Sequence, residues 1–158
     1  MIGGGTVGSG VFHALKQNGG LMASRIGVNV AIRKVAVKSL DEPRPYPIPR
    51  PLMTGNWREV VESPDIHIVA ELVGGTTIAR EIILTALKLG KPVVTANKAL
   101  LSAHGEELFA AAKNTARTCI TKPACVAAFL SSNRCAKALW ATVSRRSMAS
   151  STARAITF

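Results

Sequence analysis

The feature that most constrains the fold is the glycine-rich sequence GGGTVG at residues 3–8. Its spacing, G-x-G-x-x-G, joins a strand to a helix in dinucleotide-binding units. There the first glycine makes a tight turn, the second lets the backbone approach the pyrophosphate, and the third lets the helix pack on the strand. We therefore expect the phosphates of a dinucleotide to lie at the amino end of the helix, against Gly3, Gly5, Thr6, Val7 and Gly8.

A dinucleotide-binding loop should be preceded by a strand and followed by a helix. Val7, Val11 and Leu15 share one helical face after the loop, and residues 17–20 (QNGG) have the composition of a helix end. Before the loop stand only Met1 and Ile2. A strand at the centre of such a sheet is normally longer, so we expect the chain to begin inside its first strand, with that strand mostly missing.

The rest of the chain up to residue 113 alternates between strand and helix patterns. The predicted strands are residues 26–37, 67–73 and 93–95, and the predicted helices are a short one near residues 56–61, then 79–89 and 105–113. A proline-rich surface connection covers residues 42–51. This order predicts an α/β, Rossmann-like, doubly wound parallel sheet with right-handed crossovers.

Small and polar residues follow the later predicted strands, at the edge where a cofactor would lie. The candidate cofactor-binding residues there are Gly74, Gly75, Thr76, Ala96, Asn97 and Lys98. Thr76 or Thr77 is expected to cap the following helix. Lys38 follows the second predicted strand, where an acid would bind the ribose hydroxyls of NAD, so the choice between NAD and NADP stays open.

Three segments closely resemble the nucleotide-binding domain of the homoserine dehydrogenase family, namely residues 3–11, 69–75 and 93–101. The T-A-N-K sequence at residues 95–98 is more specific than the glycine loop. The resemblance implies an NADP- or NAD-dependent interconversion of L-aspartate 4-semialdehyde and L-homoserine, in threonine and methionine biosynthesis. It also implies that Lys98 lies beside the nicotinamide and the substrate as a catalytic residue. A cation there would stabilise the alkoxide left by hydride transfer and assist proton transfer.

The resemblance ends near Lys113, and we expect residues 114–158 to be an out-of-frame translation. This tail contains seven Lys/Arg and no Asp or Glu, so it accounts for much of the net charge of +11. Reading its back-translation two bases later permits strings such as KHGADVHYEASVCGGIPI and GNRVEAIHGIVNGTSNYI, which resemble the continuation of the family. The predicted domains are therefore an NAD(P)-binding domain at 2–113 and a frameshifted tail, without a native fold, at 114–158.

These patterns set expectations about function and leave two alternatives open. We expect the complete enzyme to bind a small-molecule substrate, to form homo-oligomers through the substrate domain and to be cytoplasmic, without a membrane anchor, whereas this chain is expected to be inactive and to bind cofactor weakly. One alternative is a small basic nucleic-acid-binding protein that uses Trp140, Arg145 and Arg146, although the tail has few aromatic residues for stacking. The other is a different Rossmann oxidoreductase.

The three cysteines, all after residue 113, are predicted to be free thiols rather than metal ligands, and no metal site is expected.

Overall fold

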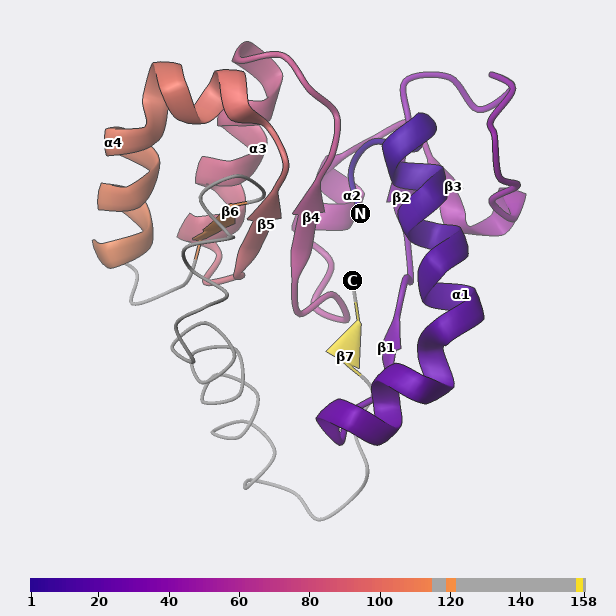
Figure 1. Ribbon diagram of the computed structural model, residues 1–158. Coiled ribbons are helices and arrows are strands. Elements are labelled where there is room, and N and C mark those ends of the chain that lie inside the picture. The colour runs from indigo at the N-terminus through magenta and orange to yellow at the C-terminus, as the bar shows by residue number, and fades with distance from the viewer. Residues whose placement is uncertain (115–118, 122–155, 158) are drawn as a thin grey trace.

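The computed structural model describes residues 1–114, 119–121 and 156–157, and its centre is a parallel sheet (Figure 1). Ile2 connects two parts of this sheet, because it forms parallel bridges with Ala36 on one side and Glu71 on the other. The resulting order is β3-β2-Ile2-β4-β5-β6, which is the strand order of a Rossmann fold. The predicted α/β doubly wound sheet is confirmed. Its strands are β2 (Val35–Ala36), β3 (Met53–Thr54), β4 (Val69–Glu71), β5 (Val93–Thr95) and β6 (Cys119–Thr121).

Helices connect these strands. Helix α1 follows the glycine-rich loop, α2 precedes β4, α3 joins β4 to β5, and α4 follows β5. Their bounds are α1 (Thr6–Ile26), α2 (Arg58–Val61), α3 (Thr77–Lys88) and α4 (Lys98–Asn114), with a 3-10 turn at Arg50–Leu52. A separate strand pair consists of β1 (Val30–Ala31) and β7 (Ile156–Thr157). Within the described residues, none of the helices combines the length and apolar character that a membrane crossing requires.

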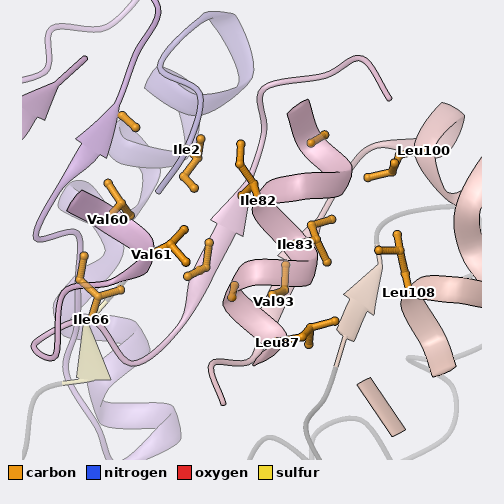
Figure 2. Packing of buried hydrophobic residues seen from close by; sticks show 14 of the residues in the cluster. Ile2, Val60, Val61, Ile66, Ile82, Ile83, Leu87, Val93, Leu100 and Leu108 are labelled. Atoms are coloured by element: carbon orange, nitrogen blue, oxygen red, sulfur yellow. The ribbon is translucent and has the colours of Figure 1, made fainter. Parts of the chain in front are cut away.

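Side chains alternate between two hydrophobic clusters on the two faces of the sheet, as the twofold period of a strand requires. Ile2 and Val69 belong to the cluster that packs against α2, α3 and α4 (Figure 2). Met1, Val35 and Ala70 belong to the other cluster, which includes Phe12 of α1. Burial on both faces explains why these strands are almost wholly apolar.

The segment Met1–Gly3 is short but fills the centre of the sheet. The amides of Ile2 and Gly3 donate to the carbonyls of Ala70 (2.8 Å) and Ala36 (2.9 Å). In return, the carbonyls of Met1 and Ile2 accept from the amides of Ala36 (2.9 Å) and Leu72 (2.7 Å). Three residues therefore satisfy backbone groups on both neighbouring strands.

The predicted end of the first helix is wrong. Helix α1 continues through Gly19 and Gly20 to Ile26, and it ends where Gly27 adopts a left-handed conformation with φ 72° and donates to the carbonyl of Ala23. Glycine inside a helix lowers its stability by about 1 kcal/mol but does not by itself end it. Val7 is also exposed rather than on the buried face, which is formed by Gly8, Ser9 and Phe12.

Two further boundaries differ from prediction. The single strand expected at residues 26–37 is interrupted, because β1 pairs with β7 whereas β2 pairs with β3 and Ile2. The helix expected at residues 105–113 is the second part of α4, after His104, whose φ of −135° is not helical, whereas the part that begins at Lys98 was not predicted. By contrast, β5 has the predicted bounds, and α2 and α3 lie where they were expected.

The buried amino terminus generates a prediction about pH. The Met1 amine donates to the carbonyl of Lys34 (2.8 Å), and burial lowers its pKa from 8.0 to about 5. Between these values the unfolded 158-residue polypeptide binds a proton that the folded one does not, so stability should rise as pH increases from about 5 to about 8. This pKa shift sets an upper limit of about 4 kcal/mol on the gain in unfolding free energy. Urea unfolding at pH values across this range measures it.

The control for this prediction is the same polypeptide acetylated at Met1. Acetylation removes the titrating amine and keeps one N–H donor for the carbonyl of Lys34. The acetylated chain should therefore lack this rise in unfolding free energy. Identical pH dependence in both forms would show that other groups cause it.

Candidate functional site

The glycine-rich loop has the geometry that its spacing predicts at the first and third glycines. Gly3 has φ 99°, and a methyl group there would lie 2.4 Å from the carbonyl oxygen of Leu72. A methyl group on Gly8 would lie 1.9 Å from the carbonyl oxygen of Gly3. Both contacts involve backbone atoms, which cannot rotate away. The start of α1 therefore packs against the loop only because Gly8 lacks a side chain, and the loop passes close to the end of β4 only because Gly3 lacks one.

The second glycine lies in open space. No heavy atom comes within 4 Å of a methyl group built on Gly5, which is the N-cap residue of α1. No side chain caps this end of the helix, and Thr6 and Val7 of its first turn are exposed. The unsatisfied amides of a helix amino end favour an anion. The loop thus combines a close-packed base with an open face that fits a phosphate group.

A second loop, after β4, lies next to the first. Gly74 and Gly75 have φ 78° and 71°, both are exposed, and a methyl group on either would meet no atom within 4 Å. Thr76 is the N-cap residue of α3, as predicted, but its side chain makes no capping hydrogen bond. The amino end of α3 is therefore also free of side-chain caps.

A third loop, after β5, is tied to the second by Asn97. Its amide nitrogen Nδ2 donates to the carbonyl of Gly75 (2.6 Å), and its Oδ1 accepts from the amide of Leu100 (3.1 Å). Asn97 thus caps α4 and joins two predicted cofactor loops. Ala96 and Lys98 on either side of it are exposed. Within the described part of the chain, the Lys98 ammonium has no hydrogen-bond or ion-pair partner.

Glu71 and Thr95 organise these loops, and no site role was predicted for either. Both are fully buried, and the Thr95 hydroxyl donates to Glu71 Oε2 (2.5 Å). Glu71 Oε1 accepts from the amides of Val73 (2.9 Å) and Gly74 (3.2 Å). An acid inside an apolar strand was the available sequence signal, because a buried carboxylate requires hydrogen-bond donors.

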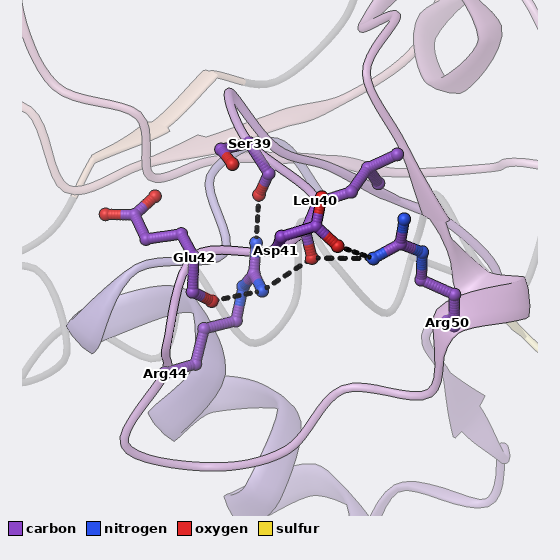
Figure 3. Close-up of polar contacts among 6 residues, drawn as sticks. All are labelled: Ser39, Leu40, Asp41, Glu42, Arg44 and Arg50. Atoms are coloured by element: carbon purple, nitrogen blue, oxygen red, sulfur yellow. Dashed lines mark hydrogen bonds and ion pairs between the residues drawn. The ribbon is translucent and has the colours of Figure 1, made fainter.

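The proline-rich connection lies on the other side of the glycine-rich loop, where Arg44 and Ile48 approach Gly4. Arg44 donates to the carbonyls of Ser39, Leu40 and Glu42 (Figure 3), and its Nε would lie 3.5 Å from a methyl group on Gly4. Arg50 pairs with Asp41 (2.6 Å) and also donates to the carbonyl of Leu40. These contacts engage the side chains of Arg44 and Arg50 and the carboxylate of Asp41.

The three loops follow the Met1–Gly3 segment, β4 and β5, which are neighbours in the sheet. All three leave the carboxyl ends of parallel strands, so the predicted site residues meet at one edge. A hollow lined by Arg33, Lys34, Ser63, Asp65 and Ile66 lies instead among the residues that precede the strands. Among the residues that the structure describes, no cluster of His, Cys, Asp or Glu could hold a metal ion. Trp140, Arg145, Arg146 and two of the cysteines lie outside the described residues.

Comparison with known proteins identifies a consistent set of relatives. The family model described as "Homoserine dehydrogenase, NAD binding domain" matches residues 3–122. The chain is 42% identical over 113 residues to a homoserine dehydrogenase of Corynebacterium glutamicum, covering 72% of this chain and 25% of the relative. It is 37% identical over 113 residues to that of Bacillus subtilis, covering 72% and 26%. The chain thus spans about a quarter of the length of these curated relatives.

Solved structures agree with the sequence relatives. A crystal structure of S. aureus homoserine dehydrogenase at pH 7.5 superposes with a TM-score of 0.72 at 29% identity, covering 77% of this chain and 31% of that one. A homoserine dehydrogenase from Thiobacillus denitrificans gives a TM-score of 0.69 at 37% identity, with 76% and 28% covered. The similarity therefore extends over the glycine-rich loop and the sheet described above.

The glycine contacts generate a prediction about which loop positions maintain the fold. Gly8→Ala should lower the unfolding free energy by about 3 kcal/mol or more, because its methyl group would overlap a backbone carbonyl. Gly5→Ala should change it by less than about 1 kcal/mol, because the position is open and its φ of −72° suits alanine. Chemical denaturation of the two variants and the unmodified chain measures both effects. Equal destabilisation would contradict the assignment of separate roles.

Proposed function

The chain belongs to the homoserine dehydrogenase family through its NAD-binding domain, and we propose that residues 2–113 hold NADP or NAD across the three loops. The site residues are those expected from the sequence. The pyrophosphate lies on the glycine-rich loop, against Gly3, Gly5, Thr6, Val7 and Gly8. The nicotinamide end lies along the other two loops, against Gly74, Gly75, Thr76, Ala96, Asn97 and Lys98.

The observation that carries this proposal is the position of the loops at the sheet's reversal point. In the order β3-β2-Ile2-β4-β5-β6, all strands are parallel, and the chain adds strands first on one side of Ile2 and then, from β4 onward, on the other side. Ligands of open α/β sheets bind in the crevice beyond the carboxyl ends at such a point. The open space around Gly5, between close-packed Gly3 and Gly8, fits a pyrophosphate there.

We propose that the complete enzyme interconverts L-aspartate 4-semialdehyde and L-homoserine. When bound, the nicotinamide supplies or accepts the hydride. Lys98 then provides a cation beside the reacting oxygen, where alkoxide charge develops, and assists the transfer of a proton to it. Its position at the first residue of α4 is electrostatically unfavourable for a lysine, since the amino end of a helix favours negative charge. Substrate recognition requires residues beyond this domain.

We further infer a preference for NADP over NAD. An NAD-specific site uses a carboxylate to bind the adenosine ribose hydroxyls. Here β2 leads through Val37 to exposed Lys38, and the nearby carboxylate of Asp41 is paired with Arg50. Val37 also lies against Gly4 of the loop, where a methyl group would come 2.5 Å from its Cγ1. On this proposal, Lys38 binds the additional phosphate of NADP.

Cofactor titration tests the binding proposal and the preference. We expect the 158-residue chain to bind NADP weakly and NAD more weakly still, because a three-residue segment supports the centre of the sheet. Lys38→Ala should reduce NADP affinity about tenfold, the size expected for one charged hydrogen bond, and leave NAD affinity unchanged. NMR titration to millimolar cofactor measures both, with Lys16→Ala on the exposed surface of α1 as the control. Absence of shifts at residues 3–8 would contradict the proposed site.

The catalytic proposal is tested in a full-length enzyme that joins residues 1–113 to the remaining part of a curated relative, because this chain spans about a quarter of the relatives' length. Lys98→Ala should lose most turnover, on the order of 100-fold or more, without loss of stability, since it removes a cation from a helix amino end. Steady-state homoserine oxidation and thermal unfolding give the two readouts. Lys88→Ala, on an exposed residue of α3, is the control. Turnover by the Lys98 variant equal to wild type would remove this residue from the mechanism.

The remaining expectations stay predictions. They are the frameshifted tail at 114–158, the lack of activity in this chain, assembly through the substrate domain and a cytoplasmic location. The nucleotide sequence around codon 113 tests the first of these. An early stop codon in the shifted frame would contradict it.

A further inference from the structure

We propose that Glu71 is a positioning residue that fixes both the Gly74–Gly75 loop and the segment carrying Lys98. The positioning role is argued from hydrogen-bond geometry, whereas its effect on cofactor binding rests on the proposed function. Glu71 ends β4 at the centre of the sheet, where it bridges Ile2 on one side and is paired with Thr95 of β5 on the other. It is fully buried.

Each carboxylate oxygen of Glu71 binds a different segment. Oε1 accepts from the amides of Val73 (2.9 Å) and Gly74 (3.2 Å), which are the residues that follow β4. Oε2 accepts from the hydroxyl of Thr95 (2.5 Å), on the neighbouring strand. Glu71 is the acceptor in all three bonds, as suits a carboxylate. Among the described residues, none of the side chains that bind it is cationic, so its position depends on these neutral donors.

Thr95 transmits this constraint to the third loop. A hydroxyl has one proton, and that of Thr95 goes to Glu71. Its oxygen Oγ1 is thereby oriented to accept from the amide of Asn97 (3.0 Å). The carboxylate therefore fixes the direction of the hydroxyl, and the hydroxyl fixes the backbone one residue before Lys98.

Asn97 links the third loop back to the second. Its Nδ2 donates back to the carbonyl of Gly75 (2.6 Å), and its Oδ1 caps α4 through the amide of Leu100 (3.1 Å). The chain from Glu71 to Gly75 and the side chains of Thr95 and Asn97 thus form one closed ring of contacts. Both members of the glycine pair have positive φ and no side chain to hold them, so the ring supplies their restraint. Loss of the carboxylate should release both loops together.

Hydrogen exchange without cofactor tests the coupling directly. In Glu71→Gln, the amide group replaces one acceptor oxygen by a donor, so exchange at the amides of Val73, Gly74 and Asn97 should accelerate about tenfold or more, the size expected for loss of a hydrogen bond to a charged group. Glu81→Gln, at an exposed residue of α3 that pairs with Arg58, is the matched control and should leave these amides unchanged. NMR exchange at Val69 and Val93 in the same samples reports whether the sheet stays folded.

A second pair of variants keeps the test decisive if Glu71→Gln unfolds. Thr95→Ser retains the hydroxyl and should preserve slow exchange, whereas Thr95→Val should accelerate exchange at Asn97 and at Val73 and Gly74. Because the residues act through one network, the double variant Glu71→Gln with Thr95→Val should add little to the larger single effect. Equal behaviour of the serine and valine variants, or unchanged exchange at Val73 and Gly74 in Thr95→Val, would overturn the proposal.

Cofactor affinity separates this proposal from the proposed function. Thr95→Val should weaken NADP binding about tenfold, and Thr95→Ser should restore it to the wild-type value. If the variants show the coupled changes in exchange but the wild-type chain shows no NADP binding at residues 3–8, the proposed function fails and the positioning network stands. If NADP binds equally to all variants despite altered exchange, the network has no role in binding and the inference is overturned.

Discussion

The hydrogen bonds of the Met1–Gly3 segment are the constraint on which the rest of the fold depends. This segment separates the two halves of the sheet and pairs with β2 on one side and β4 on the other. Its last residue begins the glycine-rich loop, so the position of α1 is set by the same bonds. Replacement of these bonds by water would disconnect the half that carries Lys38 from the half that carries Lys98. The proposed cofactor site across the sheet therefore depends on very few backbone contacts.

The sequence predicted well those parts of the site that depend on local geometry. Gly3 and Gly8 could be assigned from spacing alone, because the close approach of the end of β4 to Gly3, and of α1 to the loop at Gly8, permits no side chain at either position. The bounds of β5 followed from a short β-branched run between a glycine–proline stop and polar residues. The end of α1 was missed because Gly19-Gly20 resembles a stop, whereas the residue that adopts the left-handed conformation is Gly27.

Interactions between distant residues could not be predicted in this way. Glu71 and Thr95 are 24 residues apart, and only the register of β4 against β5 brings the carboxylate to the hydroxyl. Asn97 was predicted as a cofactor-binding residue, yet its side-chain bonds show a structural role in joining two loops. The two roles are compatible, because a loop that is held by its neighbours presents its backbone to a ligand in a defined position. Lys98 could be named from a motif, but its place on the first turn of α4 required the structure.

The connection between β2 and β3 has a consequence for the entropy of ligand binding. Prolines occur at every second position from Pro43 to Pro51, and each restricts the backbone of the unfolded chain. In the folded chain, Arg44 and Arg50 fasten the same stretch to the carbonyl groups around Leu40, and Tyr46 stacks on His13 of α1 with ring centroids 4.4 Å apart. The connection beside the proposed adenosine end is thus held in place by contacts within the folded chain. A nucleotide that binds there as proposed would lose little affinity to the freezing of loop motion.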